Sequence, residues 1–239
     1  MYNDLLCISD LKNKVVLLLL DLSAAFDTIN HSQLLIKLES QFGISENVHH
    51  WFKSYLNERS FIVTINQAKS KKSFFIIEVP QGSIFGPILF ILYTKELEAI
   101  AKMHGFSIYL YADDTQLFIE FNPLFCELHD IESKIIQCLK EIKDWMLLNH
   151  LQLNTEKTKA LVITKRNNFK SEEVNDLKIS SEELIQPVPA AKSLGVFFDV
   201  HLTFEKQIYK VVKSCYINLR NLRAIASKLD FSLKKQLVH

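Results

Sequence analysis

Two adjacent aspartates interrupt an apolar stretch near the middle of the chain, in the segment "IYLYADDTQLFIE" of residues 108–120. Apolar residues alternate on both sides of the pair, which predicts two strands joined by a tight turn. Aspartate is common in turns because its side chain hydrogen-bonds nearby backbone. Asp113 and Asp114 are therefore equally compatible with turn chemistry and with metal binding, and only the rest of the chain distinguishes these two interpretations.

A third carboxylate ends an apolar run far upstream. Residues 15–20 form a short continuous apolar segment, typical of a buried strand, and Asp21 follows directly. If this strand and the hairpin are neighbours in one sheet, three carboxylates meet at one edge and repel one another. Divalent cations relieve such repulsion, and carboxylate oxygens suit Mg²⁺. Two ions roughly 3.5–4 Å apart support phosphoryl transfer.

The remaining pattern mixes helices and strands. Helical spacing predicts helices over residues 34–42 (with Ser32 as the cap and Gly43 as the stop), 45–56, 88–100 and 128–148. Strands are predicted at 160–164, in "KSLGVFFDV", and on both sides of a lysine-rich turn in "FIVTINQAKSKKSFFIIEV". This mixture predicts an α+β fold, in which helices pack on one face of an antiparallel sheet.

Charge is unevenly distributed along the chain. The whole chain has a net charge of +1, but residues 201–239 hold eight lysines and arginines against two acids, a net of +6, which leaves −5 for residues 1–200. From Phe204 onward the apolar residues follow helical spacing, which predicts a long amphipathic helix. Its basic residues are either a solvated helix face or a surface for a polyanion.

Targeting signals and cysteine motifs are absent from the sequence. The N-terminal "MYNDLLCISD" does not look like a signal peptide, and no apolar run is long enough to span a bilayer. The four cysteines (Cys7, Cys126, Cys138 and Cys215) show no C-x-x-C spacing, as expected of reduced thiols. We therefore expect an intracellular protein, nuclear or cytoplasmic, without a membrane partner.

Five segments in this order resemble the palm motifs of reverse transcriptases: "LLLLDLSAAFDTINH", "VPQGSIFGPILFILYT", "IYLYADDTQL", "LQLNTEKTKALVI" and "KSLGVFFD". They are most similar to those of non-LTR (LINE-type) retrotransposons, from about Asn3 to the C-terminal helix. The resemblance implies an RNA-directed DNA polymerase that adds a dNTP to a primer 3′-hydroxyl on an RNA template. It implies two Mg²⁺ ions, with Mn²⁺ as an alternative, and a polymerase palm over 1–200 followed by the start of a helical thumb over 201–239.

The resemblance also implies roles for residues of the catalytic centre. Asp21, Asp113 and Asp114 would bind the metal ions, together with the backbone carbonyl of Leu22. Phe26 would be the steric gate, because a bulky ring crowds the 2′-hydroxyl of a ribonucleotide and leaves it without a hydrogen bond. Lys157 would protonate the pyrophosphate leaving group.

Other motifs would hold the nucleotide and the nucleic acid. Pro80, Gln81 and Gly82 would pack on the nucleotide and templating base, and Leu194 and Gly195 would form the primer grip. The basic helix would contact phosphates without reading sequence, through Lys206, Lys210, Lys213, Arg220 and Arg223.

Several alternatives stay open. RNA-dependent RNA polymerases place an aspartate near position 27, but Phe26 occupies the gate position, so we expect a DNA product; Asp27 and His31 are interpreted as helix-start residues. A group II intron-type reverse transcriptase shares several motifs but usually differs after "PQG". Only twenty residues of the sequence precede Asp21, where relatives carry a basic fingers region, and we expect no endonuclease within the 239 residues. We therefore expect little processive primer extension from this chain alone, and an inactive remnant that only binds nucleic acid is the third alternative.

Overall fold

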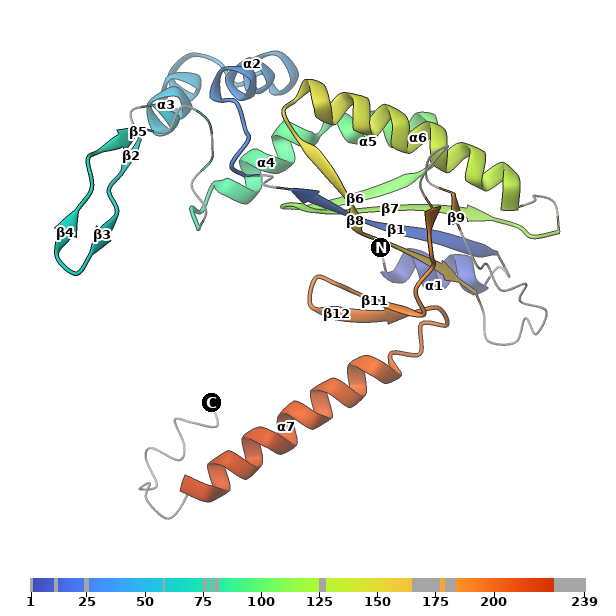
Figure 1. The fold of residues 1–239 in the computed structure, drawn as a ribbon. Helices are drawn as coiled ribbons and strands as arrows, with labels where there is room; N and C mark the ends of the chain where they lie inside the picture. Colours follow the sequence, from blue (N-terminus) through green and yellow to red (C-terminus); the bar gives the residue numbers. More distant parts are fainter. Residues whose placement is uncertain are drawn as a thin grey trace.

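A four-stranded antiparallel sheet forms the centre of the computed structural model, which describes residues 2–225 except 11–12, 24–25, 58, 75–76, 78, 80–81, 125–127, 165–176 and 179–183. Its strands are β1 (Lys14–Ser23), β6 (Ser107–Tyr111), β7 (Asp114–Phe121) and β8 (Gln152–Ile163), in the order β6-β7-β1-β8 (Figure 1). β1, the apolar strand of the sequence, pairs with β7 on one side and β8 on the other. β1 is apolar on both faces because a hydrophobic core covers each face of the sheet.

One face of the sheet carries the larger core. The helices α4 (Gly86–Thr94), α5 (Glu96–Met103) and α6 (Leu128–Leu148) cover it (Figure 1), and α2 (His31–Phe42) and α3 (Glu46–Leu56) continue the layer beyond the sheet. Leu18 and Leu117 of the sheet are fully buried there with Ile135 and Leu139 of α6. The predicted α+β fold is confirmed, and α4, α5 and α6 pack on one face of the antiparallel sheet.

A smaller core covers the opposite face. It joins Leu17 of β1 to the short helix α1 (Tyr2–Asp10) and to a hairpin of β11 (Ala190–Ser193) and β12 (Val196–Asp199). Because side chains alternate along a strand, Leu17 and its neighbour Leu18 belong to different cores.

Three local predictions need correction. The cap of α2 is Asn30 and not Ser32, because the Asn30 Oδ1 accepts the Gln33 N–H at 3.1 Å while Ser32 already lies in the first turn. Residues 88–100 form two helices that meet at Lys95. The strand predicted at 160–164 begins at Gln152, since pairing with β1 extends that far. Gly43 does end α2, with a left-handed φ of 66°.

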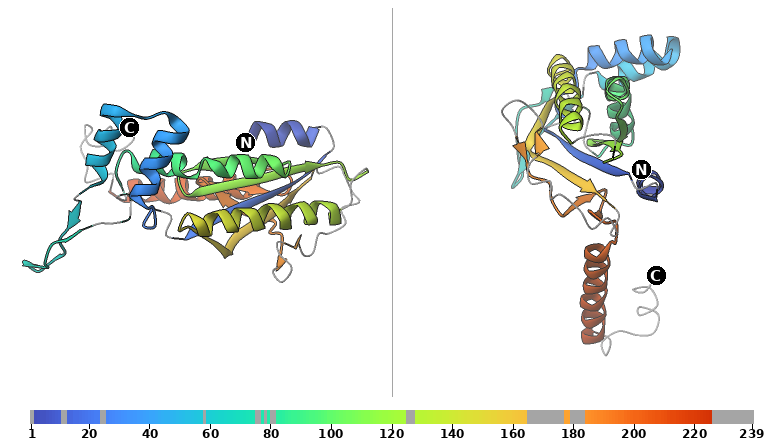
Figure 2. Two further views of the ribbon diagram at one scale, coloured as in Figure 1. Left: turned by 90° about the horizontal axis from the view of Figure 1, so that it is seen from above. Right: turned by 90° about the vertical axis from the view of Figure 1, so that its right-hand side faces the viewer.

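Two segments project from this body (Figures 1 and 2). The first is the predicted hairpin, with β2 (Ser60–Phe61) paired to β5 (Ser73–Phe74) and β3 (Thr64–Ile65) paired to β4 (Ala68–Lys69). Its turn is at Asn66–Gln67, both at positive φ, so the lysines lie on the returning side of the hairpin. The second is α7 (Glu205–Ile225), none of whose described residues is buried.

The small strands β9 (Leu177–Lys178) and β10 (Leu184–Ile185) pair beside α6 and β8. None of the described helices combines the length and apolarity that a bilayer crossing needs.

Candidate active site

The two adjacent aspartates lie at the tip of the β6–β7 hairpin. Ala112 and Asp113 form its turn, and Asp114 is the first residue of β7, paired with Tyr111 of β6. Ala112 has a positive φ of 52°, as the first central residue of a type II′ turn does. The hairpin predicted from alternation is confirmed, and it exposes both carboxylates at the sheet edge.

Asp21, on the neighbouring strand β1, lies next to this pair. In the antiparallel register of β1 and β7, Asp21 lies directly opposite Asp114. Burial raises the pKa of the Asp114 carboxyl, and the negative charges of Asp113 and Asp21 raise it further. Asp21 and Asp114, 93 positions apart in the sequence, therefore meet at one edge of one sheet, as predicted.

The donor set of this edge suits a hard divalent cation, because carboxylate oxygens are the ligands that Mg²⁺ prefers. Their mutual repulsion, visible in the raised pKa of Asp114, is what a bound cation would relieve. Among the described residues, however, no three His, Cys, Asp or Glu side chains are already grouped closely enough to hold a metal ion. Mg²⁺ usually keeps several waters and is completed by substrate phosphates, so a preformed cage is not required.

Lys157 reaches this edge from the neighbouring strand. The β1–β8 pairing is irregular between Leu19 and Asp21, where extra residues of β8 form a bulge. Asn154 stabilises the bulge, because its side chain accepts the Lys157 N–H at 3.2 Å and its carbonyl accepts the Thr158 hydroxyl at 2.7 Å. The Lys157 Nζ lies 3.9 Å from the Asp21 Oδ2. The bulge thus brings a cation to the aspartate cluster.

Phe26 and Gly82 lie on adjoining loops. The Val79 N–H donates to the Phe26 carbonyl at 2.9 Å, which ties the loop after β1 to the segment that leads to Gly82. The half-buried Phe26 ring lies 5.2 Å from the ring of Phe90 in α4. Gly82 has a φ of 78°, a conformation that favours glycine. Pro80 and Gln81 lie outside the described residues.

Leu194 and Gly195 form the turn of the β11–β12 hairpin. Their φ values of 47° and 86° are those of a type I′ turn, which matches the twist of the strands. The hairpin is tied to the aspartate strand by a buried hydrogen bond, in which the Gln116 Nε2 donates to the Ser193 Oγ at 2.6 Å. The sequence analysis missed this pair; the available signal was a glutamine inside an apolar strand pattern.

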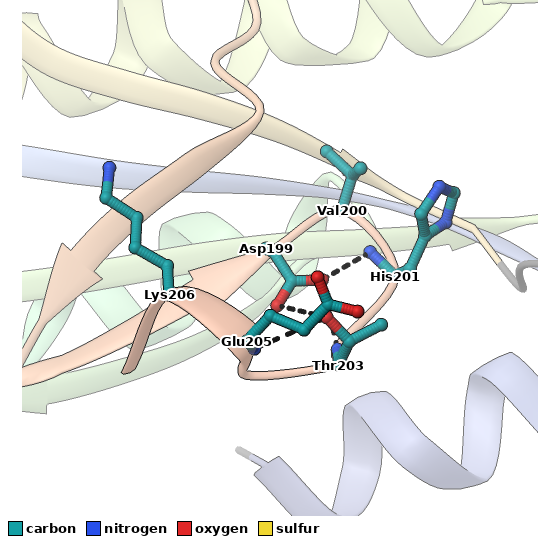
Figure 3. A pocket seen from close by; sticks show the side chains of 6 residues that line it. All are labelled: Asp199, Val200, His201, Thr203, Glu205 and Lys206. Carbon is teal, nitrogen blue, oxygen red and sulfur yellow. Dashed lines mark hydrogen bonds between the residues drawn. The ribbon is translucent and has the colours of Figure 1, made fainter. Parts of the chain in front are cut away.

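Asp199 was also missed, although it organises the connection to α7 (Figure 3). Its carboxylate accepts the backbone N–H groups of His201, Thr203 and Phe204 at 2.7–3.1 Å. Burial acts to raise the pKa of Asp199, but these hydrogen bonds and that of the Thr203 hydroxyl outweigh it and hold the pKa below its usual value. Asp199 thereby fixes the start of the basic helix.

The basic residues of α7 divide into two groups. The Lys206 and Lys210 ammonium groups lie 4.8 and 5.0 Å from the centre of the Phe197 ring, so they face the β11–β12 hairpin. Lys213, Arg220 and Arg223 are exposed farther along the helix. The structure thus brings the first group near the predicted primer-grip hairpin and leaves the second group away from it.

Comparison with known proteins shows which family the sequence matches. Residues 3–198 match the family described as reverse transcriptase (RNA-dependent DNA polymerase). The chain is 30% identical over 199 residues to the probable RNA-directed DNA polymerase from transposon X-element of Drosophila melanogaster. The match covers 80% of this chain and 20% of the relative. The chain is 26% identical over 215 residues to that from transposon BS of the same species, covering 87% and 23% respectively. The chain thus spans about a fifth of the length of these curated relatives.

Solved structures of telomerase share the fold. An apo telomerase from Candida tropicalis, truncated from its C-terminal domain, has a TM-score of 0.53 at 15% identity, over 84% of this chain and 37% of the telomerase chain. A Candida tropicalis telomerase in complex with a fragment of telomeric RNA has a TM-score of 0.56 at 14% identity, over 84% and 31%. At this identity the likeness concerns the fold alone, and it confirms the predicted palm-like architecture.

Proposed function

This chain belongs to the reverse transcriptase (RNA-dependent DNA polymerase) family, and we propose that its sheet edge catalyses RNA-directed DNA synthesis. In that reaction the primer 3′-hydroxyl attacks the α-phosphate of a dNTP, a new phosphodiester bond forms and pyrophosphate leaves. The observation that carries the proposal is the register of β1 and β7, which sets Asp21 opposite Asp114 beside Asp113. The relatives from transposons X-element and BS favour a retrotransposon origin.

In this proposal the three aspartates and the Leu22 carbonyl hold two Mg²⁺ ions, for which Mn²⁺ can substitute. When bound, the ions activate the attacking hydroxyl and stabilise the leaving oxygen. The aspartates contribute fixed negative charge at the sheet edge, where Asp114 already experiences repulsion from its neighbours.

Other residues position the substrates. The Phe26 ring, held beside Phe90, crowds a ribonucleotide 2′-hydroxyl, while Pro80, Gln81 and Gly82 line the nucleotide. Lys157 holds a proton near the leaving group, 3.9 Å from Asp21. Leu194 and Gly195 contact the primer from the hairpin that Gln116 anchors.

The basic helix completes the proposed nucleic-acid path. Residues 1–200 would form the palm and 201–239 the start of a thumb. Within α7, Lys206, Lys210, Lys213, Arg220 and Arg223 would contact backbone phosphates, with an affinity that falls as salt rises.

Metal binding and the addition of a single dNTP to a primer together test the proposal. Asp113→Asn and Asp114→Asn should each weaken Mn²⁺ binding, followed by the electron paramagnetic resonance of the free ion. Each should also reduce dNTP incorporation on an RNA template by at least about a hundredfold. The matched control is Asp130→Asn, an exposed aspartate of α6, which should leave both measurements unchanged. Mn²⁺ binding that is equal in the wild type and in Asp113→Asn would refute the metal assignment.

Phe26→Val tests the choice of sugar. A smaller side chain leaves room for a 2′-hydroxyl, so the ratio of NTP to dNTP incorporation should rise by about tenfold or more. An unchanged ratio would show that Phe26 serves only the packing against Phe90.

A further inference from the structure

The projecting hairpin carries a concentration of positive charge. We call residues 59–74 the basic arm; they include Arg59, Lys69, Lys71 and Lys72 and no acidic residue. Every side chain from Phe61 to Phe74 is exposed, and the arm points away from the sheet in Figure 1 and in the left view of Figure 2. Nothing in the described part of the chain covers it.

The arm differs in charge from the body that carries it. Its net charge is +4, whereas residues 1–200 together are −5, so the remainder of those residues carries −9. A positive projection on a negative body attracts a polyanion to the projection and repels it from the rest of residues 1–200. This charge separation favours a nucleic-acid backbone over an uncharged or basic partner.

An ordered aromatic group stands at the base of the arm. The Trp51 ring of α3 stacks on Tyr55 with ring centres 5.4 Å apart and an interplanar angle of 14°, and it meets the edge of Phe85 at 5.3 Å. Arg59 packs over Tyr55, 4.1 Å from its ring centre. Trp51 nevertheless stays 47% exposed. Its neighbours hold the indole in place while leaving surface on which an unpaired base can stack.

Further exposed aromatic residues continue along the arm. Phe61 and Phe74 lie on the paired strands β2 and β5 and are 44% and 58% exposed. The Lys72 ammonium group lies 5.0 Å from the centre of the Phe74 ring. A basic surface with interleaved aromatic rings is the arrangement that single-stranded nucleic acid requires, since phosphates meet cations and bases meet rings.

We propose that Trp51 and the basic arm form a binding surface for single-stranded RNA, outside the aspartate site. The inference rests on the proposed function, because the RNA would be the template strand on its way to or from the sheet edge. Trp51 stacks with a base, and Arg59 and the three lysines contact successive phosphates without reading sequence.

Binding of a labelled oligouridylate of about twenty nucleotides, measured by fluorescence anisotropy over a range of salt, tests the charges. The triple variant Lys69→Gln/Lys71→Gln/Lys72→Gln should bind at least tenfold more weakly at low salt. Its slope of log affinity against log salt should be shallower by about 2, since each lost phosphate contact removes about 0.7. The control Lys134→Gln/Lys140→Gln/Lys143→Gln removes the same charge from α6 and should keep the slope.

Trp51→Ala tests the stacking separately. It should weaken single-strand binding by about tenfold with an unchanged salt slope, and it should affect a duplex of the same length much less. Trp51→Phe, which keeps an aromatic ring and the contact with Phe85, should restore most of the affinity. Equal effects of Trp51→Ala on single strand and duplex would overturn the stacking role.

Two outcomes would overturn the arm proposal. One is an arm variant that binds RNA with the wild-type affinity and salt slope. The other outcome concerns the oligomeric state, measured by sedimentation. If the wild type is a dimer, and Phe61→Ser/Ile65→Ser makes it a monomer without changing RNA binding, the arm is an interface between copies of the chain. Failure of the proposed function is distinguishable, because it would appear as an Asp113→Asn variant with unaltered Mn²⁺ binding, whatever the arm binds.

Discussion

Asp114 lies opposite Asp21 and next to Asp113, so the candidate site concentrates like charges where strands pair. Burial and both neighbouring carboxylates raise the pKa of Asp114. Like charges directly across an antiparallel pair destabilise a sheet. At the residue scale, the features that suit metal binding therefore reduce the stability of the metal-free fold.

Asp114→Asn should consequently stabilise the metal-free chain at neutral pH. Because the folded-state pKa of Asp114 is raised, its ionisation destabilises the fold above that pKa, and the penalty disappears as the pH falls through it. The gain should stay below about 1 kcal/mol, since the pair is solvent-exposed and screened. Thermal unfolding in a chelator measures it, with Glu120→Gln on the same strand as control. A lower melting temperature for Asp114→Asn would contradict the argument.

Lys157 should matter for catalysis and not for stability. Its contact with Asp21 is long, and the side chains are 71% and 43% exposed, so Lys157→Met should change the free energy of unfolding by less than about 0.5 kcal/mol. If Lys157 donates a proton, the variant should lose about a hundredfold in the rate at which a single dNTP is added to a primer, and Lys157→Arg should lose less. Lys159→Met, two residues farther along β8, serves as control. Equal losses at both lysines would indicate a general charge effect.

At the scale of elements, hydrogen bonds between distant segments set where the predicted functional parts lie. Gln116 of β7 binds Ser193 and thereby fixes the β11–β12 hairpin on the sheet face opposite α6. Asp199 then fixes the turn from β12 into α7. The orientation of the basic helix relative to the aspartates thus depends on two polar side chains outside the motifs.

Asp199→Ala should lower the free energy of unfolding by about 2 kcal/mol, because three backbone donors lose a charged acceptor. The folded-state pKa of Asp199 is lowered, so its stabilisation is present above the usual aspartate pKa and is lost as the pH falls through the lowered value. Urea unfolding at neutral and acidic pH measures both effects. Asp144→Ala on α6 is the control, and an equal effect there would argue against a specific role for the turn.

At the scale of the whole molecule, one sheet supports two separate cores. Leu17 and Leu18 are both fully buried and adjacent in sequence, yet Leu17 packs against α1 and the β11–β12 hairpin and Leu18 against the helical layer. The parts that would hold primer and nucleic acid thus depend on the smaller core.

Leu17→Ala and Leu18→Ala should each cost about 2–5 kcal/mol, but they should loosen different parts of the chain. Hydrogen exchange should accelerate over β11, β12 and α1 in Leu17→Ala, and over α4, α5 and α6 in Leu18→Ala, since local opening follows the damaged core. The same pattern of acceleration in both variants would show that the two cores unfold as one unit.

The sequence by itself determined the local structure and the family. Alternation around Asp113 and Asp114 predicted the hairpin, Gly43 predicted the end of α2, and ordered motifs predicted a reverse transcriptase; all three are confirmed. These features depend on side-chain periodicity and backbone preference within a few residues, which a linear sequence records directly.

Only the tertiary structure decided which distant residues meet. The Asp21–Asp114 register, the approach of Lys157 on a bulge, the Gln116–Ser193 bond and the Asp199 turn each depend on strand pairing or packing between segments far apart in the chain. The N-cap of α2 shows that residue type alone is insufficient even at short range. Ser32 and Asn30 are equally good caps by residue type, and the backbone geometry at the start of α2 selects Asn30. Pairing and packing are collective, so no single stretch of sequence encodes them.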